Sequence, residues 1–106
     1  MRVLFDQGTP LPLRKHLSPH QVSTAFELNW SALKNGELIA RAEASGFDAL
    51  VTTDQNLKYQ QNLADRRIAL VVISTTSWPR IQQHVAAVLE ALEAAIAGAF
   101  IEVPIP

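Results

Sequence analysis

Cysteine is absent from this chain of 106 residues, which excludes disulfide bonds and metal sites built on thiolates. Any metal ion must be held by carboxylate, amide or imidazole groups, and oxygen ligands suit hard divalent cations. No apolar run reaches the roughly 20 residues that cross a membrane, and a strand pattern starts directly after the first methionine. We therefore expect no signal peptide, no membrane partner and a cytoplasmic location.

The chain also lacks an excess of charge of either sign. Nine Lys and Arg side chains face ten Asp and Glu side chains, which gives a formal net charge of −1. This balance argues against broad electrostatic adhesion to nucleic acid. Any RNA contact must be local, with Arg14, Lys15 and Lys58 as candidates, although paired charges such as Arg14 and Lys15 are also typical of solvated helix ends.

Short apolar runs alternate with helical patterns along the chain. The segments that predict strands are Arg2–Phe5, Gln21–Thr24, Asp48–Thr52, Ile68–Ile73 and Phe100–Val103. Strands that alternate with helices favour a mostly parallel sheet joined by right-handed crossovers. The sequence therefore predicts an α/β fold with the first strand beside the third, and the absence of repeats and linkers predicts one domain over residues 1–106.

Helix signals fill the spaces between these strands. The predicted helices are Pro10–Leu17, Asn35–Ser45, about Leu57–Ala64 and one continuous helix within Pro79–Ala97. Thr9 is placed to cap the first helix, with Pro10 as its first residue. Gly46 is placed to end the second helix.

The first and third predicted strands both end in aspartate. Asp6 follows the first strand directly, and Asp54 follows the third. Open parallel sheets bind ligands beyond the carboxyl ends of their strands, where the strand order reverses. If the two strands are neighbours, both carboxylates border one crevice, and Glu37, in the first turn of the second helix, can point to the same place.

Each of these acids also has a purely structural interpretation. Asp is common in turns and helix caps, and Glu37 can stabilise a helix N-terminus electrostatically. Two ionised carboxylates about 4 Å apart repel by about 4 kcal/mol at an effective dielectric constant of 20, so a shared site needs a proton or a cation. Mg²⁺ or Mn²⁺ is the cation that such oxygen ligands suit.

Four segments resemble a known family. They are residues 6–8 (Asp-Gln-Gly), residues 20–30, residues 34–38 (Lys-Asn-Gly-Glu-Leu) and residues 51–57 (Val-Thr-Thr-Asp-Gln-Asn-Leu). They are similar to the small bacterial PIN-like proteins, and the resemblance covers most of the chain up to Ile73. It implies a compact three-layer α/β/α sandwich and metal-dependent cleavage of RNA, with a role as the toxin of a toxin–antitoxin pair.

The resemblance also assigns roles to individual residues. Asp6, Glu37 and Asp54 match acidic positions of the family, which implies that they bind Mg²⁺ or Mn²⁺ and carry catalysis. Apart from the resemblance, a metal-dependent ribonuclease would use Asn35 and Asn56 to orient water or substrate, and Lys58, which closely follows Asp54, could hold a phosphate. Thr53 is a further candidate accessory residue.

The chain departs from the family at two of these positions. Many relatives have an acid where this chain has Asn35, and Asp-x-Asp-Phe where it has Asp54-Gln55-Asn56-Leu57. An amide oxygen can bind a cation, but it adds no negative charge and is not a base at neutral pH.

Three functions follow from these observations and stay open. The first is a metal-dependent ribonuclease silenced by a cognate antitoxin. The second is a non-catalytic PIN-like module that binds RNA or a partner protein through the same crevice. The third is a structural subunit. We also expect a homodimer.

Overall fold

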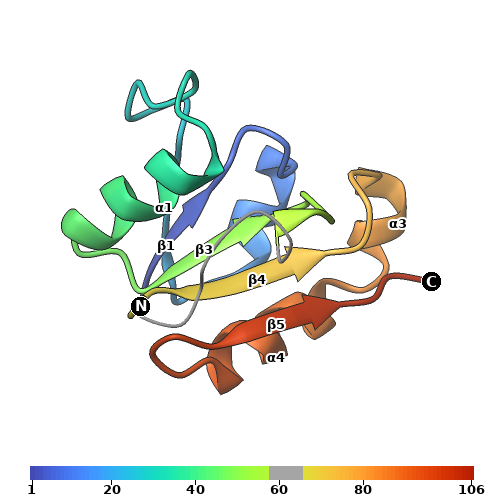
Figure 1. Ribbon diagram of the computed structural model, residues 1–106. Coiled ribbons are helices and arrows are strands. Elements are labelled where there is room, and N and C mark those ends of the chain that lie inside the picture. The colour runs from blue at the N-terminus through green and yellow to red at the C-terminus, as the bar shows by residue number, and fades with distance from the viewer. Residues whose placement is uncertain (58–65) are drawn as a thin grey trace.

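The computed structural model describes residues 1–57 and 66–106, and in this part of the chain it shows an α/β fold on one five-stranded sheet (Figure 1). The strands are β1 Arg2–Phe5, β2 Gln21–Thr24, β3 Ala49–Thr52, β4 Ala69–Ile73 and β5 Phe100–Val103. They lie in the order β2-β1-β3-β4-β5, and every neighbouring pair is parallel. The predicted α/β class, the parallel sheet and the pairing of the first strand with the third are confirmed.

Helices lie on both faces of this sheet. The described helices are α1 Asn35–Ala44, α3 Trp78–Gln82, α4 Val85–Ala94 and the 3₁₀ helix η1 Leu11–His16. On one face the buried residues of α1 pack against the sheet, and these are Leu38, Ile39 and Ala42. The buried residues on the opposite face come from η1, α3 and α4, and they include Leu13, Ile81, Val88 and Leu92.

Because helices cover both faces of the sheet, the central strands are apolar throughout. All residues of β3 and β4 are buried, as expected for strands covered on both sides. Alternate side chains point to opposite layers, so Leu50 packs with the α1 layer and Val51 packs with the other. Each such side chain contributes about 1.5–3 kcal/mol by leaving water.

The end of α1 follows the sequence closely. Gly46 has φ of +86°, and the N–H of Phe47 donates to the carbonyl of Ala42 at 3.0 Å while the N–H of Gly46 donates to Glu43 at 3.1 Å. These two bonds form a Schellman motif, which favours glycine at the left-handed position. The predicted role of Gly46 as the helix stop is confirmed.

Two of the helix predictions were wrong in part. Thr9 does not cap η1, because its hydroxyl contacts the carboxylate of Asp6 and the carbonyl of Val51 instead, and Pro10 is the flanking residue at the cap position. The continuous helix within Pro79–Ala97 is two helices, separated at His84, where φ is −134°. The helix predicted from about 57 to 64 falls on residues 58–65, outside the described residues.

No helix in residues 1–57 or 66–106 combines the length and the apolar character that crossing a bilayer requires.

The order of the strands shows which edge of the sheet is suited to bind a ligand. From β1 the chain first adds β2 on one side and then β3 on the other, so the strand order reverses between β1 and β3. The carboxyl ends of these two strands are where an open α/β sheet of this order binds its ligands.

Candidate functional site

Asp6 lies at the carboxyl end of β1 and is half-buried. Its backbone N–H donates to the carbonyl of Val51 at 3.3 Å, which keeps the residue against β3 just beyond the strand. Its carboxylate accepts one hydrogen bond from the hydroxyl of Thr9 at 2.7 Å and another from the hydroxyl of Thr52. Two neutral donors from different segments therefore fix the orientation of this acid.

Thr52 joins the two predicted aspartates. It is the last residue of β3 and only 1% exposed, and its Oγ1 donates to Asp6 while accepting the backbone N–H of Asp54 at 3.1 Å. A hydroxyl has one proton and two lone pairs, so it can do both at once. The structure thus links Asp6 and Asp54 through one buried side chain at the switch point of the sheet.

Asp54 is held by two further groups. One carboxylate oxygen accepts the backbone N–H of Asn56 at 2.9 Å, which forms a local turn, and the other accepts the side-chain amide of Asn35. Asn35 is the first residue of α1, so this contact connects the helix to the end of β3. Asp6, Asp54 and Asn35 are brought together as one network.

The other predicted site residues take different positions. Glu37 is exposed in the first turn of α1, and the side chain of Thr53 donates to the carbonyl of Gly8 at 3.3 Å. Within residues 1–57 and 66–106, no three acidic or imidazole side chains gather closely enough to hold a metal ion, so Glu37 does not join the aspartates in a three-acid cluster there. Lys58 lies outside the described residues.

The loops that carry the network are tied to each other. A Cβ added at Gly8 would lie 2.9 Å from Oγ1 of Thr53, so the loops after β1 and β3 approach as closely as a glycine permits. The side chain of Gln55 donates to the carbonyls of Thr53 and of Ile73, at the end of β4. The carboxyl ends of three neighbouring strands are thereby held in one rigid rim.

A groove of about 480 Å³ opens beside Asp6. Its lining residues are Asp6, Gln7, Thr9, Leu11, Thr24, Phe26 and Glu27. A second hollow, of about 550 Å³, lies at the opposite end of the sheet near the start of β4, and its lining contains none of the predicted site residues. Of these two hollows in the described residues, the groove beside Asp6 is the one whose lining includes a residue of the network.

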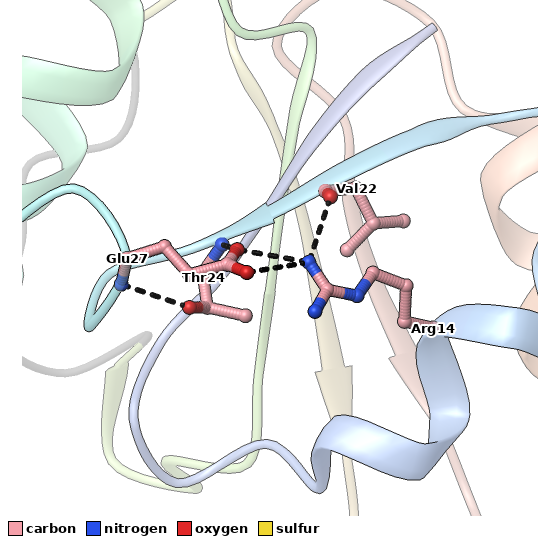
Figure 2. Close-up of polar contacts among 4 residues, drawn as sticks. All are labelled: Arg14, Val22, Thr24 and Glu27. Carbon is pink, nitrogen blue, oxygen red and sulfur yellow. Dashed lines mark hydrogen bonds and ion pairs between the residues drawn. The ribbon is translucent and has the colours of Figure 1, made fainter.

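Thr24, Phe26 and Glu27, which line this groove, belong to one turn. Figure 2 shows the polar contacts that hold this turn. The hydroxyl of Thr24 accepts the backbone N–H of Glu27 at 3.1 Å, and the carboxylate of Glu27 accepts the N–H of Thr24 at 3.0 Å, a reciprocal pair like a capping box. Nη1 of Arg14 lies 2.8 and 3.0 Å from the two carboxylate oxygens of Glu27. This hydrogen bond, followed by that from Thr24, lowers the pKa of Glu27 below its ordinary value.

The same ion pair changes the expectation for RNA contacts. The sequence offered Arg14 as a phosphate contact, but its guanidinium is engaged by Glu27 and also donates to the carbonyl of Val22 at 3.3 Å. Sequence reasoning missed both Thr52 and Glu27. The Thr24-x-x-Glu27 spacing was the signal for the turn, whereas a threonine ending a buried strand carries no comparable signal.

Comparison of the chain with family models, with curated proteins and with solved structures finds no match. The resemblance to PIN-like proteins therefore stays a prediction from the sequence. A parallel α/β sheet hosts many unrelated activities, so function has to be argued from the network around Asp6 and Asp54.

Proposed function

We propose that the chain is a PIN-like domain that binds Mg²⁺ or Mn²⁺ at Asp6 and Asp54 and cleaves RNA there. The observation that carries this proposal is the connection of the two aspartates through the buried hydroxyl of Thr52 at the switch point of the sheet. Two acids at the carboxyl ends of neighbouring strands, where such sheets bind ligands, are suited to a hard cation.

The surroundings of the two acids fit a cation. Each carboxylate has about four lone-pair directions, and the contacts to Asp6 come from Thr9 and Thr52, while those to Asp54 come from Asn35 and the backbone of Asn56. All these donors are neutral, so they orient the carboxylates without cancelling their negative charge. Within the part of the chain that the structure describes, lone pairs and charge on both carboxylates therefore remain for a metal ion.

The cation and the side chains of the protein would have different roles in the cleavage reaction. When bound, the cation would supply positive charge that stabilises the negative charge developing on the scissile phosphate. The chain holds Asp6 and Asp54 in fixed orientations, so that neither has to reorganise during reaction. Either carboxylate can accept a proton from an attacking water. Glu37, the third acid expected from the sequence, is exposed in the first turn of α1 and does not gather with the two aspartates within the described residues, so the proposed site rests on Asp6 and Asp54.

A second function is favoured by the amides. Asn35 donates its amide to Asp54, and Asn56 stands where many PIN-like relatives have an acid, so the network holds less negative charge than the family pattern implies. A non-catalytic PIN-like module that binds RNA or a protein through the same crevice would keep this network without needing a third acid. The toxin role, the cognate antitoxin and the homodimer are proposed on the resemblance alone.

Cleavage of a labelled RNA tests the proposal directly. The natural chain should cut it only when Mg²⁺ or Mn²⁺ is present, and Asp6→Asn and Asp54→Asn should each lower the rate by about 100-fold or more. Glu93→Gln, which removes one exposed carboxylate from α4, is the matched control and should cut normally. RNA binding without cleavage would favour the second function. The absence of both would reject the ribonuclease and an RNA-binding role, and would leave only a module that binds a protein.

A further inference from the structure

Two exposed apolar side chains meet at the groove beside Asp6. Phe26 is 79% exposed and Leu11 is 52% exposed, and within the described residues only Met1 and Ile96 are comparable among large apolar side chains. Both Phe26 and Leu11 line the groove that also includes the carboxylate-bearing Asp6. An apolar surface is therefore continuous with the network proposed to bind the cation.

The exposure of Phe26 does not come from a loosely attached loop. In the sequence, Phe26 lies between Thr24 and Glu27. The reciprocal hydrogen bonds of Thr24 and Glu27, together with the contact of Glu27 with Arg14, hold the turn (Figure 2). The flanking backbone is tied as well, since the N–H of Ala25 donates to the carbonyl of Phe5 at 2.9 Å. The aromatic ring is presented to solvent from a fixed support, so binding against it orders little additional chain.

The charges around the groove narrow the chemistry of its ligand. Asp6 and Glu27 are acceptors with negative charge, and the positive charge of Arg14 is already directed at Glu27. The side chains of the groove therefore offer no positive charge to a phosphate, which would need the cation proposed at Asp6 and Asp54. The groove suits a neutral planar ring that stacks on Phe26 and carries N–H donors on its edge, which is the chemistry of an amino-bearing nucleobase.

We infer that this groove is a nucleobase subsite, in which one base of a single-stranded RNA stacks on Phe26 while the neighbouring phosphate lies at Asp6 and Asp54. The inference rests on the proposed function, and it identifies a base of the RNA as the part of the substrate that binds in the groove. It also accounts for RNA binding by a chain of near-neutral charge, because stacking is worth about 5- to 150-fold in affinity per base without a basic side chain.

The affinities of two labelled hexanucleotides distinguish the contribution of the bases to binding from that of the phosphates. One probe is hexa-adenylate and the other is an abasic hexamer with the same backbone charge, and both are titrated in Ca²⁺ with the natural chain, Phe26→Ala, Phe26→Trp and Ile96→Ala. The natural chain should bind hexa-adenylate about 5- to 150-fold more tightly than the abasic probe. Phe26→Ala should remove this preference, and Phe26→Trp should keep it. Ile96→Ala removes a similarly exposed apolar side chain at the other end of the sheet and should leave the affinity for both probes unchanged.

Three results would overturn the inference. If the natural chain cleaves RNA but Phe26→Ala binds both probes as the natural chain does, the subsite is wrong while the proposed function stands. If the natural chain binds neither probe and cleaves nothing, both fail. If sedimentation shows self-association that Phe26→Ala abolishes while probe binding is unaffected, the apolar surface serves a second copy of the chain instead of a base.

Discussion

Replacing Thr52 with valine removes the connection between the two aspartates at nearly constant volume. Thr52→Val deletes a hydrogen bond to the carboxylate of Asp6 and leaves the backbone N–H of Asp54 without its acceptor. A bond to a charged group contributes about 1.5–3 kcal/mol and a neutral one about 0.5–1.5 kcal/mol, so we expect a loss of about 2–4 kcal/mol in the free energy of unfolding. For a domain of this size that lowers Tm by about 10–20 °C.

Urea unfolding of matched variants measures the effect of the hydroxyl alone. Thr52→Ser keeps the hydroxyl and loses one buried methyl group, which costs about 0.5–1.5 kcal/mol. The valine variant should therefore be clearly less stable than the serine variant, with an unchanged m-value. In an Asp6→Ala background the penalty of Thr52→Val should shrink, because the charged partner is gone.

A different ranking would refute this reasoning. If Thr52→Val is as stable as Thr52→Ser, the hydroxyl does not hold the rim of the sheet. If its penalty is the same with and without the carboxylate of Asp6, the two residues are not coupled, and the site loses the contact on which it was built.

Three further predictions follow from neighbouring contacts. Gly8→Ala places a Cβ against Oγ1 of Thr53 and should destabilise the fold by about 1–3 kcal/mol, and Thr53→Ala should restore most of that loss in a urea titration of the double variant. The hydrogen bond from Arg14 lowers the pKa of Glu27 below 4.5, so the stability that Glu27 adds is present above pH 4.5 and is lost as the pH falls through the lowered pKa. Glu27→Gln should therefore unfold in urea more easily than the natural chain at pH 6, and the difference should shrink as the pH is lowered below 4.5. Asn56→Asp should lower Tm without metal and raise the stabilisation by Mn²⁺, and two unmoved melting curves would contradict a site there.

The fold could be predicted largely because its signals are local. The strands ending at Phe5 and Thr52 are short apolar runs, and the left-handed Gly46 ends a helix of regular apolar spacing, so each was visible in a few residues. The break at His84 was not, because the spacing of apolar residues continues across it from Ile81 to Val85.

The site could be predicted only in outline. Asp6 and Asp54 were recognisable because each follows an apolar strand, and the parallel pairing of those strands brings their ends together. The contacts that complete the network join residues far apart in sequence, such as Thr52 with Asp6 and Asn35 with Asp54. Nothing within a short window distinguishes a threonine that bridges two acids from one that only ends a strand.

The groove beside Asp6 also could not be predicted from the sequence, because it is formed by residues from different strands and loops. The Thr24-x-x-Glu27 spacing marks a fixed turn, but that its apolar residue, Phe26, stands beside Asp6 follows from the parallel pairing of β2 with β1. Composition alone, with 7% aromatic residues, gave no reason to single out this one. Its significance appears only when the groove and the network are seen to share Asp6.

Titration calorimetry with Mn²⁺ tests the central claim that Asp6 and Asp54 form one cation site. The natural chain and Glu93→Gln should bind with the same Kd, whereas Asp6→Asn and Asp54→Asn should each weaken binding by at least about tenfold, which corresponds to about 1.4 kcal/mol. The account is contradicted if the natural chain binds no Mn²⁺, or if all four proteins bind it equally.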